Sequence, residues 1–189
     1  MAAFGVALLI AAACFYIRAI QYEALNLRPL SLPVSLAPGT IRTPEFRTDF
    51  EYWDYEIAVD WDAKASVQRT RPMLIDMSWQ LFEGANIAAE GKSEDNSNLL
   101  EEPGILYERR IGSFRAQKGH QYTLILHVNR DASDQNSTHP RIVVQVPKLY
   151  WEDHAMGVGF QKLIAGVSGI IGMIALIGAF VRNRRERRG

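Results

Sequence analysis

A run of 19 residues without a charged side chain, residues 163–181, constrains this chain more than any other feature of its sequence. At 1.5 Å per residue, an α-helix of this length reaches about 29 Å, which matches the hydrocarbon core of a bilayer. Lys162 precedes the run, Arg182 follows it, and Ser168 is its only polar side chain. The run therefore predicts a transmembrane helix and not the buried core helix of a soluble protein.

Arginines follow this run at once, and the sequence suggests that they orient it. They are Arg182, Arg184, Arg185, Arg187 and Arg188. With one glutamate among them, the tail of residues 182–189 has a net charge of +4. Because cytoplasmic flanks of transmembrane helices are rich in Lys and Arg, we expect this tail in the cytoplasm. A sorting signal and a patch for anionic lipids are the alternative interpretations of the same charges.

A second apolar stretch, residues 2–17, opens the sequence, and we expect residues 1–21 to form an N-terminal transmembrane anchor. The alternative is a signal peptide cleaved near Ala11, Ala12 and Ala13. No basic region precedes the stretch, and the chain stays apolar after the alanines, which favours an uncleaved anchor. Two spans place both termini in the cytoplasm and the central domain outside a cytoplasmic (inner) membrane or its equivalent.

The region between the two apolar runs is acidic and poor in cysteine. Residues 22–157 contain 14 Lys or Arg against 20 Asp or Glu, a net charge of −6. Such a domain repels phosphate backbones, which argues against a nucleic-acid partner. Cys14, in the first apolar stretch, is the only cysteine, so thiolate-bound metals and c-type haem are excluded and no cofactor is expected.

The central region alternates between apolar and polar residues with a period of two, the pattern of half-buried strands. Tyr55, Ile57, Val59 and Trp61 share one face, and the same alternation recurs in residues 73–81, 122–128 and 142–146. Residues 25–44 contain four prolines, which suit an extended strand at a sheet edge. Turn residues separate the strands at 83–86 and 117–119, while 129–139 is expected to be a polar loop.

These patterns predict an all-β fold class, an antiparallel β-sandwich of seven or eight strands, jelly-roll-like or immunoglobulin-like, flanked by two transmembrane helices. The expected division is an anchor at 1–21, an extracytoplasmic β-sandwich at 22–154, a C-terminal transmembrane helix with its interfacial lead-in at 155–181, and the basic tail.

Candidate sites in the domain are few. The acidic residues Asp54, Glu56, Asp60 and Asp62 lie on the polar face of one strand and are interpreted as a solvated face that discourages edge pairing. Residues 129–136 contain side chains of calcium-ligand type, but they lack the spacing and the glycine of an EF-hand loop. No serine elbow or helical zinc motif is present, so we expect no metal, no catalytic residues and no enzyme activity.

Small residues in the two apolar segments suggest a helix-packing surface. Gly166, Gly169, Gly172, Ala175 and Gly178 recur every three residues of the second segment, while the first segment offers Ala3, Ala7 and Ala11. Such residues let helix backbones approach closely, so the groove is expected to receive either the first helix or a partner subunit.

The function expected from the sequence is non-enzymatic: a membrane-anchored β-sandwich that contacts other proteins, such as an accessory subunit of a membrane complex, with self-association as a further option. A membrane-tethered glycan-binding module is the alternative, because Trp53, Trp61 and Trp79 could stack on sugar rings if they pointed outwards. A membrane-bound hydrolase is a third possibility and would require a deep polar pocket.

Overall fold

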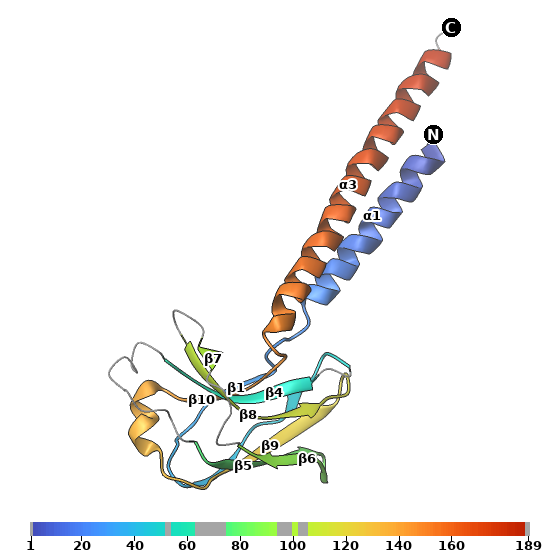
Figure 1. Cartoon of the computed structure of the whole chain (residues 1–189). Helices are drawn as coiled ribbons and strands as arrows, with labels where there is room; N and C mark the ends of the chain where they lie inside the picture. Colours follow the sequence, from blue (N-terminus) through green and yellow to red (C-terminus); the bar gives the residue numbers. More distant parts are fainter. Residues whose placement is uncertain (1, 52–53, 63–74, 94–99, 102–105, 188–189) are drawn as a thin grey trace. The chain divides into compact units, whose positions relative to one another are not determined.

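The computed structural model describes residues 2–51, 54–62, 75–93, 100–101 and 106–187, which form two compact units (Figure 1). One unit is helical and combines Met1–Leu25 with Leu149–Gly189, whereas the other, Asn26–Lys148, is built of strands. The all-β class predicted from the sequence therefore applies to Asn26–Lys148 and not to the chain as a whole.

The β unit contains ten strands in its described residues, more than the seven or eight predicted. Their bounds are β1 (Leu30–Pro33), β2 (Gly39–Arg42), β3 (Phe46–Arg47), β4 (Asp54–Asp62), β5 (Met77–Glu83), β6 (Asn86–Lys92), β7 (Leu100–Glu101), β8 (Leu106–Arg115), β9 (Gln121–Val128) and β10 (Arg141–Gln145). Two of them, β3 and β7, are two residues long, too short to show an alternation in the sequence. The polar loop predicted at 129–139 also contains a short 3-10 helix, η1 (Ser133–Thr138).

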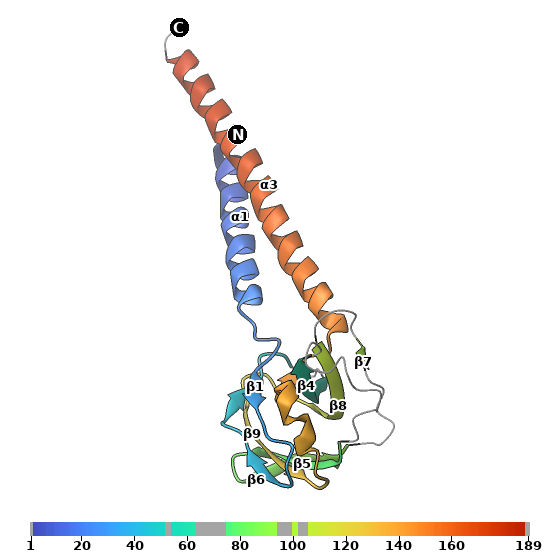
Figure 2. The same cartoon turned by 90° about the vertical axis from the view of Figure 1, so that its left-hand side faces the viewer.

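The strands form two antiparallel sheets, as in a β-sandwich. The first sheet has the order β1-β10-β4-β8-β7, and the second has the order β2-β9-β5-β6, with β3 also pairing with β9. Figures 1 and 2 show β4 and β8 in one layer and β5 and β6 in the other. The proline-rich entry segment forms β1 at the edge of the first sheet, as predicted, because an edge strand has one side without hydrogen-bond partners.

The core lies between the sheets, and the period-two pattern predicts its members. Tyr55, Ile57, Val59 and Trp61 of β4 are all buried. The alternating residues of β9 are buried as well: Tyr122, Leu124, Leu126 and Val128. Rings from three elements meet in this core, where Phe114 lies 5.8 Å from Tyr55 and 5.6 Å from Tyr122 between centroids.

Trp79 of β5 occupies a slot made by two glycines from different sheets. A Cβ added to Gly112 of β8 would lie 2.3 Å from Trp79 Nε1, and one added to Gly91 of β6 would lie 2.7 Å from Cζ2 of the same indole. The indole N–H donates a 3.1 Å hydrogen bond to the Ile111 carbonyl. Since Trp79 is only 4% exposed, the two glycines provide the space that this large core side chain needs.

The helical unit consists of α1 (Ala2–Glu23) and α3 (Leu149–Glu186), which lie side by side in Figures 1 and 2. Both helices are long and apolar enough to cross a membrane. α3 begins at Leu149, six residues before the start expected from the sequence. It is also continuous from Leu149 to Glu186, so the lead-in and the apolar run are parts of a single helix.

Candidate functional site

The two chain ends of the β unit lie next to each other. β1 and β10 pair antiparallel, with Leu30 opposite Val144, and the Val146 N–H donates a 2.8 Å hydrogen bond to the Leu27 carbonyl. The chain therefore enters and leaves the β unit at one place, on the first sheet. Polar side chains gather at this place and form a continuous network.

Arg28, which lies just before β1, connects two strands of the first sheet. Its guanidinium forms an ion pair with Asp60 of β4, and its Nε donates a 3.1 Å hydrogen bond to Gln145 Oε1 of β10. The planar fork of arginine suits this arrangement, because it presents several N–H donors in fixed directions. Arg28 thus fastens the entering chain to two strands at once.

Glu108 of β8 completes the network from the other side. Its Oε1 accepts a 2.6 Å hydrogen bond from Gln145 Nε2, and the Lys148 ammonium lies 3.1 Å from its Oε2 in an ion pair without hydrogen-bond geometry. β4 runs between β10 and β8, so the Gln145–Glu108 bond passes over it. Ala58 of β4 lies beneath this bond, midway between the residues opposite Gln145 and Glu108, and its small side chain leaves the space for them.

We call these five residues, Arg28, Asp60, Glu108, Gln145 and Lys148, the linker network. Asp60 is 2% exposed, Glu108 is 1% exposed and Gln145 is fully buried. Asp60 alternates with the core residues Val59 and Trp61, so it lies on the sheet face that points away from the core. The interpretation of this face as solvated is therefore wrong at Asp60, because side chains from both chain ends cover it.

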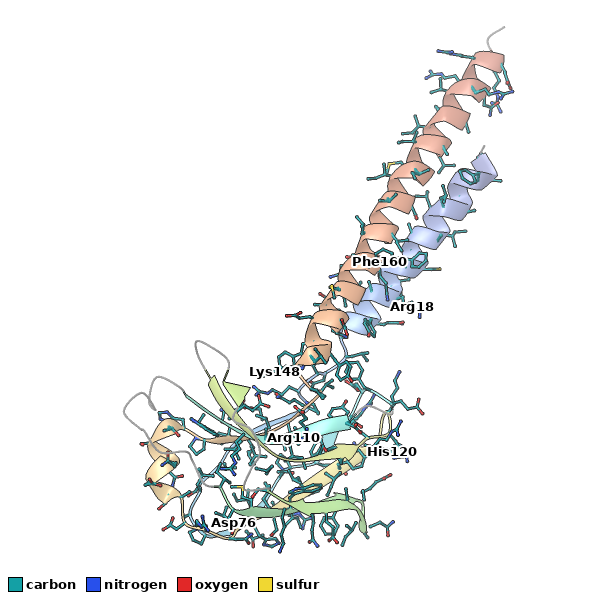
Figure 3. The ribbon with its side chains drawn as sticks, viewed as in Figure 1. Arg18, Asp76, Arg110, His120, Lys148 and Phe160 are labelled. Atoms are coloured by element: carbon teal, nitrogen blue, oxygen red, sulfur yellow. The ribbon has the colours of Figure 1, made fainter. Side chains whose placement is uncertain are left out.

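Burial dominates the electrostatics of this face. It raises the pKa of the Asp60 carboxyl, since desolvation penalises the charged form; the nearby Arg28 lowers the same pKa, and Glu108 raises it. The Oδ1 atom of Asp60 is buried and has no hydrogen-bond partner among the residues that the structure describes. Burial likewise raises the pKa of Glu56, which Arg110 opposes from 3.4 Å. Arg110, labelled with Lys148 in Figure 3, also donates a 2.8 Å hydrogen bond to Ser113.

The polar loop weighed as a calcium site uses its side chains within the fold. Asn136 Oδ1 accepts a 2.8 Å hydrogen bond from the Leu36 N–H, and Asp131 Oδ1 accepts one of 2.9 Å from the Ser133 N–H. Asn129 donates to Asp76, which Figure 3 labels. Within the described residues, no three His, Cys, Asp or Glu side chains come together as a metal site. The loop is thus held by hydrogen bonds within itself and to Leu36 and Asp76.

One histidine–carboxylate pair has the geometry of a general acid–base couple. His120, labelled in Figure 3, follows the turn after β8, and its Nδ1 lies 2.6 Å from Glu83 Oε1 at the end of β5. Both side chains are about 40% exposed. A nucleophile or an oxyanion donor would have to converge on such a pair for catalysis, and the described contacts of His120 and Glu83 include neither.

In the helical unit, the packing surface follows a heptad pattern and not the three-residue glycine pattern. A row of buried or half-buried residues of α3 follows this pattern: His154, Val158, Gln161, Ala165, Ser168, Gly172, Ala175 and Ala179. Those of α1 are Gly5, Leu8, Ala12, Phe15, Ala19 and Tyr22. Steps of three and four residues alternate in both lists, which keeps one face of each helix toward its neighbour.

Two of the eight predicted packing residues, Gly172 and Ala175, belong to this face, and two more, Gly169 and Ala11, are half-buried beside it. Gly172 is in closest contact, because an added Cβ would lie 3.0 Å from the Gly5 carbonyl oxygen, whereas one at Gly169 would lie 3.8 Å from the Ala12 Cβ. Ala175 and Ala11 are half-buried. The other four, Gly166, Gly178, Ala3 and Ala7, are exposed. Each step of three residues falls about 60° short of a full turn, so the glycine row winds away from α1.

Polar residues mark one end of the helical unit. The rings of Tyr22 and His154 lie 4.4 Å apart between centroids, and Lys162 Nζ makes contacts of 2.7 and 2.9 Å with the two carboxylate oxygens of Glu23. Arg18 lies in the same stretch of the hairpin as Phe160 (Figure 3). At the other end, Arg182, Arg184, Arg185 and Arg187 are exposed, and Arg188 lies outside the described residues.

Neither the linker network nor the heptad face was identified from the sequence. The network depends on cross-strand register, which places Glu108 opposite Asp60 and Gln145 opposite Glu56. The heptad face had a readable signal, since three polar residues, His154, Gln161 and Ser168, stand seven positions apart on that side of the helix.

Comparison with known proteins gives little further information. No protein-family model matches the sequence, and no curated protein matches it. Among solved structures, the chain is similar to GEBA250068378 from Sulfurospirillum deleyianum, at 11% sequence identity and a TM-score of 0.43, over 64% of this chain and 98% of that one. A likeness at this level carries no argument about function, so function must be argued from the residues themselves.

Proposed function

We propose that the chain is a non-enzymatic integral membrane protein whose α1–α3 hairpin spans an inner or equivalent membrane and whose β unit contacts other proteins outside it. The observation that carries the proposal is the surface of the hairpin. Large apolar side chains point away from the heptad face on both helices: Phe4, Ile10, Ile17, Phe160, Leu163, Ile170, Ile174, Ile177 and Phe180. Phe160 and Ile170 are 63% and 61% exposed, which suits lipid as the surrounding solvent.

The contact register of the hairpin supports a full span. Tyr22 lies against Gly157 and Ala12 against Gly169, so Arg18 is level with about residue 162 of α3. Arg18 and Lys162 then mark one boundary of the apolar zone, and Arg182 marks the other, about 30 Å away. The positive-inside rule orients this span with both termini in the cytoplasm and the β unit outside.

The strand pairing favours a jelly roll over an immunoglobulin-like sandwich. β1 pairs with β10, β2 with β9, β4 with β8 and β5 with β6, so the first strands pair with the last ones in nested order. A long antiparallel ribbon that is rolled into two sheets gives this order. Jelly rolls have many unrelated functions, and this assignment therefore specifies the architecture alone.

The edge strand β6 is the surface that we propose for protein contact. Among the described strands it pairs only with β5, and five of its seven residues are exposed, including Ile87 at 52%. An open edge offers a row of backbone donors and acceptors to an extended segment of a partner. The glycan alternative has less support, because Trp61 and Trp79 are buried in the core. Trp53 lies outside the described residues.

Reporter fusions and cross-linking test this proposal. A reporter that is active only outside the membrane should be active after Arg130 and inactive after Arg187, and the opposite pattern would overturn the topology. A photo-cross-linking residue at Ile87 should capture a protein partner in intact membranes. The matched control is the exposed Lys118, at the turn between β8 and β9, where we expect no adduct. Equal labelling from both positions would contradict the assignment to β6.

A further inference from the structure

The last turn of α3 carries exposed arginines beyond the level at which α1 begins. Gly5 of α1 faces Gly172 and Leu176, so Ala2 is level with about residue 178. α3 continues as a helix to Glu186, with Arg182, Arg184 and Arg185 in its final turns and Arg187 directly after. No described residue of α1 stands beside them. We call these four residues the arginine collar.

The arginine side chains point to all sides of the helix, and this favours a contact with lipid over a contact with a protein. With about 100° of rotation per residue, Arg184 and Arg185 point about 200° and 300° around the axis from Arg182. The collar therefore surrounds the helix and forms no single stripe. A groove on a protein partner contacts one side of a helix, whereas lipid headgroups surround all sides of a helix that spans a bilayer. From Arg182 to Arg187 the rise is about 7.5 Å, close to the depth of one headgroup layer.

The charge of the collar is only partly neutralised within the chain. Arg182 Nε lies 2.8 Å from Glu186 Oε1, but no ion pair to Arg184, Arg185 or Arg187 is seen within the described residues. The opposite end of the hairpin differs in sign, because the stretch that carries Arg18 and Lys162 also carries three carboxylates, those of Glu23, Glu152 and Asp153, and Lys162 is paired with Glu23. The two ends of the hairpin are thus electrostatically distinct.

From these observations we infer that the arginine collar binds the phosphate groups of anionic phospholipids in the leaflet that surrounds the end of α3. This inference rests on the proposed membrane span. Each guanidinium can chelate a phosphate through two parallel N–H bonds, and a basic residue beside an anionic leaflet strengthens binding several-fold. The protein would then hold a shell of anionic lipid around the end of its hairpin.

The test measures lipid retention by the full-length protein. The chain is purified in mild detergent with equal amounts of phosphatidylglycerol and phosphatidylcholine, and bound lipids are counted by native mass spectrometry. We expect phosphatidylglycerol to be retained preferentially. The triple variant Arg184→Gln/Arg185→Gln/Arg187→Gln should reduce this preference about tenfold or more. The matched control, Arg42→Gln/Lys118→Gln/Arg130→Gln, removes three exposed charges from the β unit and should leave it unchanged.

Two further measurements keep the inference separate from the proposed span. Resistance to alkaline carbonate extraction reports on insertion for every variant, and extraction of the wild type would overturn both the span and the collar. If the wild type is inserted but shows no lipid preference, or if the collar variant and the control lose it equally, the collar inference alone fails. A salt titration of the wild type needs no variant: about 0.5 M NaCl should remove the preference, and its persistence would contradict an electrostatic collar.

Discussion

Gly5 and Gly172 face each other across the helical hairpin so closely that a Cβ on either one would lie 2.9 to 3.0 Å from the carbonyl oxygen of the other. Backbone meets backbone here, and neither partner can move as a flexible side chain would. This contact fixes the register of α1 against α3, and with it the levels of Arg18 and of the arginine collar.

Substitution of Gly172 should separate the two helices, whereas substitution of Gly178 should not. A leucine at Gly172 has no room against Gly5, but an added Cβ at Gly178 meets nothing within 4 Å. Disulfide formation between Ala12→Cys and Gly169→Cys, in a Cys14→Ser background, measures the approach of the helices. We expect efficient cross-linking in this background and with Gly178→Leu, and a loss of several-fold with Gly172→Leu. Equal cross-linking in both leucine variants would show that the contact does not hold the hairpin.

Removal of Arg28 should destabilise the β unit far more than removal of Arg110. Arg28→Met leaves Asp60 buried and charged without its cation, which costs about 2–4 kcal/mol of unfolding free energy after allowance for the partial exposure of Arg28. Arg110→Met breaks a pair whose arginine is 47% exposed and should cost less than about 1 kcal/mol. Chemical denaturation of the full chain in detergent, followed by tryptophan fluorescence, measures both.

The double variant Arg28→Met/Asp60→Leu tests the cause of that loss. Because it removes the buried charge together with its partner, it should recover most of the stability lost in Arg28→Met. If the double variant is as unstable as the single one, the lost packing of the arginine stem, and not the stranded carboxylate, explains the effect.

The pH dependence of the protein's thermal stability should reveal the raised pKa of the Asp60 carboxyl. Its pKa is raised in the folded state, so the folded protein binds this proton more tightly than the unfolded chain does. The penalty for the charged form is complete above the folded pKa and is relieved as the pH falls from there toward the ordinary range near 4. The melting temperature of the wild type minus that of Asp60→Asn should therefore rise as the pH falls from 7 to about 4.5. A difference that stays constant or decreases would contradict the raised pKa.

The slot around Trp79 should not tolerate a methyl group on Gly112. Gly112→Ala places a Cβ 2.3 Å from the indole nitrogen and should cost about 1–3 kcal/mol of unfolding free energy. The smaller ring of Trp79→Phe leaves more space. Gly112→Ala should therefore cost less unfolding free energy in the Trp79→Phe background than in the wild type. If the cost is the same in both backgrounds, the loss does not come from crowding of the ring. Ala88→Ser, on the exposed part of β6, serves as a neutral control.

The parts of this structure that depend on local patterns were predictable from the sequence, and those that depend on register were not. Tyr55, Ile57, Val59 and Trp61 are buried as their alternation predicts, because one face of a strand must face the core. Asp60, in the same strand, departs from the pattern because Arg28 covers it from 32 residues away. No property of the residues around Asp60 reveals that neighbour.

In the helical hairpin, too, local composition was predictable from the sequence and the contact geometry was not. Small residues predict close helix packing, and Gly172 provides it. The face used follows an alternation of three and four residues, which keeps one side of each helix toward the other over many turns, so Gly166 and Gly178 point elsewhere. Gly5, the partner of Gly172, is not part of the alanine row of α1 and could be identified only once the register was known.

The pairing of β1 with β10 also determines when this protein can finish folding. Leu30 and Val144 are opposite each other although 114 residues separate them in the chain, and the nested strands between them close in turn. A ribosome adds residues in order, so the first strand must wait without its neighbour until almost the whole β unit has been synthesised. α1 and α3 are separated by the same delay. Assembly of the hairpin and closure of the first sheet are therefore late events that fall close together. A chain halted before β10 would have β1 and the contact face of α1 without their partners, and Arg28 without Gln145.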